Sequence, residues 1–295
     1  MRTDCHTHLT LADAGALLTR LGVEPFSVDD LLRRMDAEGI DRSVVLPSDS
    51  PELACSGIAG TVEVMGATRA HRDRLIPFCN VDPRAWHNRA DGDLGRMLAA
   101  WQDAGARGVG EVTPNLWFDD PRMENLFHHA GALGLPLLFH VAHQIGDVYG
   151  PADDPGLPRL ERMLAACPET VFIAHAQSFW AEISSDLRPE DRGRYPSGPV
   201  KAGRVPELLG RYPNLYADLS AGSGFNAVSR DPEFGRRFLA QFAAKLLLGT
   251  DRFAPSHPRP PILDFLSGAG LAPAALAAIE HGNLARLLGE APAAG

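Results

Sequence analysis

Short apolar runs alternate with longer amphipathic stretches from one end of the chain to the other. The short runs have the length of buried strands, and the longer stretches repeat apolar residues every three or four positions, as helices do. The runs predict eight strands, at Arg2–His6, Ser43–Pro47, Leu75–Val81, Gly108–Val112, Pro136–Val141, Thr170–His175, Asn214–Leu219 and Leu246–Asp251. The stretches predict eight helices, at Leu31–Ala37, Ile58–His71, Asp93–Ala104, Pro121–Ala132, Leu157–Cys167, Val205–Tyr212, Pro232–Phe242 and Pro273–Leu288. Ser27 is expected to cap the first of these helices, with Asp30 as the acid of a capping box.

The strict alternation of strand and helix predicts right-handed β–α–β units and a parallel sheet. Eight such units within 295 residues match the size of a (β/α)8 TIM barrel, an α/β fold. A doubly wound open sheet is the alternative, but no phosphate-binding glycine fingerprint follows the first strand. We therefore expect one barrel domain over residues 1–289, with the alanine- and proline-rich residues 290–295 as a frayed tail.

Three of the predicted loops are unusually long. They are Leu9–Phe26, Ala142–Gly156 and Ala176–Val200, after strands one, five and six. Because function in a barrel collects on the loops that follow the strands, these three loops are expected to form the walls and lid of a pocket.

Side chains with metal-binding chemistry stand at the carboxyl ends of five predicted strands. They are His6 and His8 on strand one, Glu111 on strand four, His140 on strand five, His175 on strand six and Asp251 on strand eight. Residues i and i+2 of a strand share a face, so His6 and His8 are expected to project inward together, with Cys5 packed on the opposite face. Each residue alone is more often structural than metal-binding, but buried imidazoles and carboxylates without partners are costly. Their shared position therefore predicts a site for Zn²⁺, Mn²⁺, Fe²⁺ or Co²⁺.

Weaker candidates for substrate contact lie on the loops beyond these strand ends. Their polar or aromatic side chains follow strands five, six and seven: His143, Trp180, Arg194, Tyr195 and Asn226. His128 lies in a predicted helix that faces away from the barrel mouth, so we expect it at the surface. Exposed loop residues without a role are the alternative interpretation of the set.

The charge and composition of the chain limit the kinds of partner that the protein is expected to bind. The net charge is −9, so the chain as a whole repels nucleic acid and anionic membrane surfaces, and a small-molecule substrate is expected instead. The sequence contains neither a run of 18 uncharged apolar residues nor the apolar core of a signal peptide at its start. The four cysteines show no CxxC spacing, which favours reduced thiols and a cytoplasmic location. A homodimer is only the general expectation for a soluble enzyme.

The ordered set of strand-end residues resembles the amidohydrolase superfamily. The similarity is greatest to its amidohydrolase-related branch, which also contains lactonases and aromatic-acid decarboxylases. It extends from Thr3-Asp4-Cys5-His6-Thr7-His8 to Gly282-Asn283-Leu284-Ala285-Arg286-Leu287-Leu288. The resemblance implies a metal-dependent barrel hydrolase whose metal centre uses the six strand-end residues.

One departure from the superfamily is visible in the sequence. Many members bridge two metals with a carbamylated lysine at the end of strand four, but the first lysine of this chain is Lys201. Glu111 occupies that position instead. A carboxylate bridge would allow two metals, which we favour slightly. A single metal held by His6, His8, His140 and Asp251 is the alternative.

The ligand set predicts hydrolysis of an amide, lactam or lactone in a small polar metabolite. A divalent metal, with zinc expected first, would activate water at neutral pH, and Asp251 would act as general base. His175 would either complete a second metal site or polarise the substrate carbonyl. A metal-dependent decarboxylase of the same branch is the nearest rival. A nuclease and a non-catalytic metal-binding protein are more distant alternatives.

Overall fold

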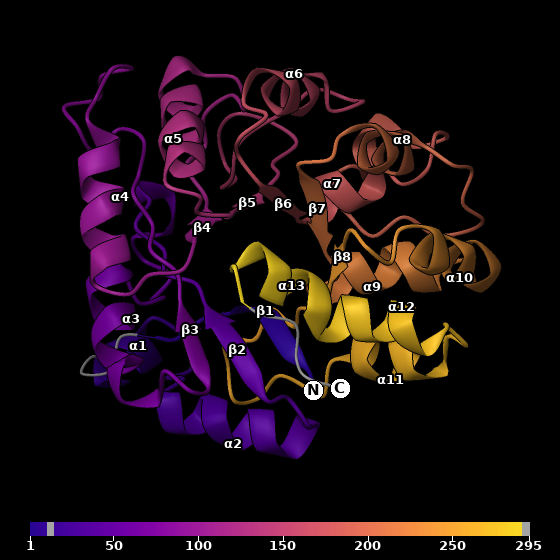
Figure 1. Cartoon of the computed structure of the whole chain (residues 1–295), viewed down its shortest axis with the longest axis horizontal. Coiled ribbons are helices and arrows are strands. Elements are labelled where there is room, and N and C mark those ends of the chain that lie inside the picture. The colour runs from indigo at the N-terminus through magenta and orange to yellow at the C-terminus, as the bar shows by residue number, and fades with distance from the viewer. Residues whose placement is uncertain (11–14, 291–295) are drawn as a thin grey trace.

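Eight parallel strands surround a central axis and a ring of helices surrounds the strands (Figure 1). The computed structural model describes residues 1–10 and 15–290. The strands are β1 (Thr3–Thr7), β2 (Arg42–Val45), β3 (Leu75–Pro77), β4 (Val109–Val112), β5 (Leu137–His140), β6 (Phe172–His175), β7 (Leu215–Asp218) and β8 (Leu246–Leu247). All eight predicted strands are present, and their parallel order around one axis is that of the expected TIM barrel.

Single backbone bridges close the barrel. The regular pairing forms two sheets, of strands β1 to β3 and of strands β4 to β8, each in sequence order. A parallel bridge between Cys79 and Val109 joins β3 to β4, and another between Thr7 and Arg252 joins β8 to β1. The amide of Cys5 also donates to the carbonyl oxygen of Leu248. The carboxyl ends of all eight strands therefore meet at one end of the molecule.

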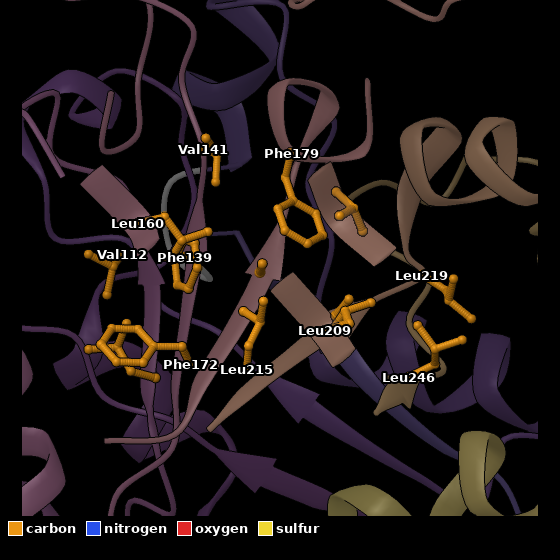
Figure 2. Packing of buried hydrophobic residues seen from close by; sticks show 14 of the residues in the cluster. Val112, Phe139, Val141, Leu160, Phe172, Phe179, Leu209, Leu215, Leu219 and Leu246 are labelled. Carbon is orange, nitrogen blue, oxygen red and sulfur yellow. The ribbon is translucent and has the colours of Figure 1, made fainter. Parts of the chain in front are cut away.

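Two apolar layers hold the strands in place. The inner layer fills the barrel with one residue from most strands, including Val44, Leu138 and Ile173, and Leu284 packs against it. The outer layer lies between strands and helices, and Figure 2 shows Phe139, Phe172 and Leu215 within it. Because each strand is covered on both faces, its sequence is a continuous apolar run rather than an alternating one.

The helices that cover the strands agree well with their sequence signals. They are α1 (Gly15–Arg20), α2 (Val28–Glu38), α3 (Thr61–Ala67), α4 (Leu94–Asp103), α5 (Pro121–Ala132), α6 (Pro158–Ala166), α7 (Gln177–Ala181), α8 (Arg204–Arg211), α9 (Ala221–Ser229), α10 (Pro232–Gln241), α11 (Pro261–Gly268), α12 (Pro273–Ala277) and α13 (Asn283–Leu287). Asp93, Asp120 and Asp231 each accept a backbone N–H at the start of their helix. The predicted helix at Pro273–Leu288 is two helices joined by a π-helical turn at Ala278–Gly282. None of the described helices is long and apolar enough to cross a bilayer.

The sequence pattern missed four helices, α1, α7, α9 and α11. All are short and follow strand ends, where the chain must turn back along the barrel. Helix α9 contains two glycines, Gly222 and Gly224, which lower helix propensity. A Cβ at Gly224 would lie 2.4 Å from the backbone of Leu219, so close packing requires this residue. Tertiary contact thus outweighs local propensity here.

The end of strand β8 and the C-terminal tail differ in detail from what the sequence predicts. The last predicted strand extended to Asp251, but β8 ends at Leu247, and Asp251 lies on the loop beyond it with a left-handed φ of 56°. Glu290, the first residue of the predicted frayed tail, accepts two hydrogen bonds from the Arg42 guanidinium. Residues 291–295 of that tail lie outside the described residues.

The capping box of α2 gives a small, clean test of local stability. The Ser27 hydroxyl accepts from the amide of Asp30 at 3.2 Å, and the Asp30 carboxylate accepts from the amide of Ser27 at 3.0 Å. Ser27→Ala should lower the free energy of unfolding by about 1 kcal/mol, because an N-terminal donor of the helix loses its partner. Urea denaturation measures this change. Ser27→Thr keeps the hydroxyl, and an equal loss in that control would contradict the explanation.

Candidate metal centre

The six predicted strand-end residues come together at one end of the barrel. His6 lies in β1 and His8 directly after it, Glu111 lies in β4, and β5 and β6 end at His140 and His175. Asp251 reaches the same place from the loop after β8. His6, His8, Glu111 and His175 are buried, and His140 and Asp251 are partly exposed. The sequence prediction that these side chains converge is therefore met by the geometry.

Donor atoms of His6, His8 and Asp251 surround one point, and an oxygen of Glu111 lies beside the two histidines. The Nε2 atoms of His6 and His8 are 3.0 Å apart, and Asp251 Oδ1 lies 3.4 and 3.5 Å from them. Glu111 Oε2 lies 3.9 and 3.7 Å from the same two nitrogens. Ligands about 2.1 Å from a tetrahedral metal are separated by about 3.4 Å, so these spacings fit one divalent ion.

Hydrogen bonds on the far side of each ring orient the two histidines of β1. The Nδ1–H of His8 donates to the carbonyl oxygen of Leu46 at 2.9 Å. His6 Nδ1 lies 2.7 Å from Asp218 Oδ2. Both contacts place the remaining lone pair on Nε2, which faces the other donors. This is the arrangement that metal-binding histidines require.

Asp218 is the residue that the sequence analysis missed. It ends β7 and is fully buried. Its Oδ2 lies 3.1 Å from His175 Nδ1 and accepts from the Ser220 hydroxyl at 2.6 Å. Burial opposes its ionisation, but the bonds and charges of His175 and His6 hold its pKa well below the usual range. Its position at the end of an apolar strand is the same signal that identified the other residues, and it was available in Leu215-Tyr216-Ala217-Asp218.

The side chain of Cys5 does not point away from the histidines, as the sequence analysis expected. Its thiol donates to Asp218 Oδ1 at 3.2 Å, so it contacts the same carboxylate as His6 instead of pointing to the opposite face. The register between β1 and β2 shifts between Asp4 and Thr7, and this irregularity breaks the simple alternation of faces. Burial raises the pKa of the Cys5 thiol well above its usual value, which keeps it protonated. The expectation that Cys5 packs in the core is confirmed.

Glu111 faces two groups of partners with its two oxygens. While Oε2 faces His6 and His8, Oε1 lies 3.1 Å from His140 Nδ1. Burial by itself would raise the pKa of Glu111, but the hydrogen bond from His140 and the nearby imidazoles hold it well below its usual range. Glu111, His140 and His175 form a second group of donors whose ligand atoms lie within 4.8 Å of one another. A carboxylate in this position can join two sites.

The surrounding charges set the protonation of the remaining groups. Burial lowers the pKa of His175, but Asp218, Asp251 and Glu111 outweigh it and raise this pKa to about 9. The pKa of His140 lies below its usual value, because burial lowers it more than the Glu111 carboxylate raises it. The pKa of Asp251 stays below its usual value, despite burial, because of His6 and His8. Asp251 is therefore an ionised carboxylate beside the candidate ion.

A pocket of about 450 Å³ opens onto this centre. His8, Glu111, His140 and Asp251 form its polar end. The walls come from the loops after β1, β2, β5 and β8, with the side chains of Thr10, Val23, Glu24, Leu53, Ser56, Ile58, Tyr149, Phe253 and Ala254. The predicted contribution of the long loops after β1 and β5 agrees with this lining. The loop Ala176–Val200 after β6, which is described throughout and was also expected to form a wall, contributes no lining residue.

The weaker substrate candidates lie in different places. Trp180 is 2% exposed, packs in the outer layer and donates its indole N–H to the Asp218 carbonyl oxygen, so it is a core residue and not a pocket residue. Tyr195 is 53% exposed and lines a neighbouring hollow together with Asp251. His143, Arg194 and Asn226 are outside the lining of the pocket at the metal centre.

The donor set fits a divalent cation on chemical grounds. Glu111 and Asp251 bring two carboxylates against the His6–His8 pair in a largely buried position, where like charges would otherwise repel. Imidazole and carboxylate ligands suit zinc and neighbouring divalent metals. The residues present therefore fit such an ion.

Asp218→Asn should weaken metal binding by about 10- to 100-fold, because an amide orients the His6 ring less well than a carboxylate does. Competition with a fluorescent chelator measures the affinity. Asp153→Asn is the matched control, since Asp153 is equally buried but accepts backbone amides at the start of α6. Equal effects of the two substitutions would mean that Asp218 acts only through stability.

Comparisons with known proteins identify the fold and the family of the chain. No curated protein sequence gives a significant match. A probable 2-pyrone-4,6-dicarboxylic acid hydrolase from Acinetobacter baumannii is 13% identical, with 98% of this chain and 99% of that chain covered and a TM-score of 0.61. The 5-carboxyvanillate decarboxylase of Sphingomonas paucimobilis is 15% identical, with coverage of 98% and 99% and a TM-score of 0.62. A manganese-bound dihydroxybenzoic acid decarboxylase from Polaromonas sp. JS666 is 15% identical, with coverage of 98% and 96% and a TM-score of 0.60.

At these identities the solved structures establish the barrel fold, and the family rests on the sequence. A family model described as amidohydrolase matches residues 3–289, nearly the whole chain. That stretch contains all six strand-end donors and Asp218. The protein therefore belongs to the amidohydrolase family.

Proposed function

We propose that this protein is a metal-dependent hydrolase that cleaves the C–N or C–O bond of an amide, lactam or lactone in a small molecule. The observation that carries the proposal is the position of Asp251. Its carboxylate lies among the metal-donor atoms and also lines the pocket, so it can contact both the ion and the substrate. When bound, a divalent ion supplies a Lewis acid and lowers the pKa of water.

The side chains of the protein would divide the remaining work. Asp251 is held ionised and would accept a proton from the attacking water and return it to the leaving nitrogen or oxygen. His6, His8 and Glu111 would hold the ion. Asp218 would orient the rings of His6 and His175 through their Nδ1 atoms. We assign His175 a positioning role through Asp218, because its Nδ1 lies 3.1 Å from that carboxylate and the residue is buried outside the lining of the pocket.

We further propose one tightly held ion, at His6, His8, Glu111 and Asp251, with zinc as its identity. The second group shares Glu111 and adds only His140 and His175, so it has fewer donors of its own. This differs from the slight preference for two ions in the sequence analysis. Plasma mass spectrometry of protein purified without chelators or a histidine tag should find about one ion per chain. About two tightly held ions would contradict the single site and support Glu111 as a bridge.

Decarboxylation is the second candidate, because two of the structural neighbours reported above are decarboxylases. Hydrolysis and decarboxylation can be separated by their products. The metal-loaded protein should convert members of a lactone, lactam and amide panel to the ring-opened or cleaved acid, and metal depletion should abolish this activity. Release of carbon dioxide from aromatic carboxylic acids, without hydrolysis of any panel member, would overturn the hydrolase proposal.

A further inference from the structure

The walls of the pocket at the metal centre are mainly apolar. Val23, Leu53, Ile58, Phe253 and Ala254 all contribute to them. Phe253 is 40% exposed, which is high for a large apolar side chain near a buried centre. An apolar part of a ligand would cover this surface and gain free energy from its removal from water.

The charged groups of the pocket are all acidic. Among the described residues that line it, Glu24, Glu111 and Asp251 are acidic and none is lysine or arginine. Residues 11–14, which lie outside the description, contain neither lysine nor arginine in the sequence. A divalent ion would neutralise Glu111 and Asp251, which leaves Glu24 as the charge of the walls. Hydrogen bonds from Ser256 hold the pKa of Glu24 below its usual value, so this residue is ionised.

The nearby arginines are engaged elsewhere. Arg252 follows Asp251 but is 2% exposed, and its guanidinium donates to Glu38 and to the carbonyl oxygens of His257 and Pro258. Arg84 forms ion pairs with Glu52 and Asp82. An anionic group placed against these walls would therefore lose its hydration without gaining a counter-charge, which is unfavourable.

We propose that the substrate is an uncharged molecule with an alkyl or aryl portion, such as a neutral lactone, ester or amide, and that a carboxylate away from the reacting bond is rejected. The proposal rests on the hydrolase function proposed above. The apolar portion would contact Val23, Leu53, Ile58 and Phe253, while the reacting carbonyl would face Asp251. Thr10, Ser56 and Tyr149 carry the hydroxyl groups of the walls, and the Thr10 hydroxyl is already bonded to the backbone of Phe26.

A pair of metal-binding probes tests this preference without any turnover. Benzohydroxamic acid and its para-carboxylated analogue share the same chelating group and differ only in a remote carboxylate. Calorimetry with the metal-loaded full chain should show that the neutral probe binds at least about 10-fold more tightly. Equal affinities, or tighter binding of the carboxylated probe, would overturn the inference and leave the hydrolase proposal standing. Failure of both probes to bind would count against both proposals, because the metal-bearing pocket itself would be in doubt.

A charge introduced into the wall provides the complementary test. Ile58→Arg should improve binding of the carboxylated probe relative to the neutral one by about 10-fold, because it supplies the missing counter-charge. Val62→Arg is the matched control, since Val62 is 67% exposed on α3 and is not a pocket residue. Leu53→Arg repeats the test at a second wall position if the first variant does not fold. An unchanged preference in folded wall variants would contradict the proposed pocket.

Discussion

Asp251→Asn is expected to lower kcat by about 1,000-fold or more while the protein keeps its fold and most of its metal. An amide oxygen can still lie against the ion, but an amide does not accept a proton at neutral pH. A fall in kcat with metal retained would therefore report the role of Asp251 as general base separately from its role as metal ligand. Asp251 is the only one of the proposed ligands in a left-handed backbone conformation, with a φ of 56°.

The left-handed backbone conformation at Asp251 makes asparagine a better replacement than alanine. Asparagine tolerates the left-handed region nearly as well as aspartate does, whereas alanine would add strain and confuse the comparison. Asp264→Asn on the exposed face of α11 is a control that changes charge by the same amount. Metal content, the melting temperature and kcat should be measured on both variants. Near-normal turnover by Asp251→Asn would remove Asp251 as the base.

His6→Ala is expected to have the second large effect, a near-complete loss of bound metal and, with it, of activity. The substitution removes one of the proposed donors and leaves the Asp218 carboxylate without the imidazole that lies 2.7 Å from it. The fall in metal affinity should exceed the roughly 10- to 100-fold expected when only an outer partner is changed. The melting temperature of the variant should then no longer rise on addition of metal, because stabilisation by a ligand requires binding to the folded state.

A second histidine distinguishes loss of a donor from general damage. His8→Ala also removes a donor but leaves Asp218 paired, so it should lose metal with a smaller loss of stability. His128→Ala is the control, because His128 is exposed on α5, as the sequence predicts, and bonds to Glu169. Unchanged metal stoichiometry in both His6→Ala and His8→Ala would show that the pair on β1 is not part of the centre.

Local patterns explain why so much of this protein could be predicted. A strand that is covered on both faces must be apolar along its length, so a histidine or carboxylate at its end is conspicuous. Chain direction then places every such end on the same side of a parallel barrel. His140 and His175 were identified in this way, and they lie side by side on adjacent parallel strands, paired in register.

The irregular parts could not be obtained from periodicity. The irregularity in β1 brings Cys5 and His6 to one carboxylate, and the two-residue strand β8 releases Asp251 onto a loop. Trp180 looks like a loop aromatic in the sequence, yet packing against the outer layer buries it. Each of these outcomes depends on contacts between segments far apart in the chain.

The amino-acid sequence by itself determined the barrel, the order of its strands and the six candidate metal-binding residues at or just beyond their ends. Burial and chain direction produce a regular pattern of apolar and polar residues along the chain, and this pattern can be recognised in short stretches of sequence. Only the tertiary structure decided that Asp218 joins His6 to His175, that Glu111 faces two groups of partners, and that the pocket has apolar and acidic walls. These features depend on distances between atoms from different loops and strands. Such distances follow from the packing of the whole chain, which no short stretch of sequence encodes.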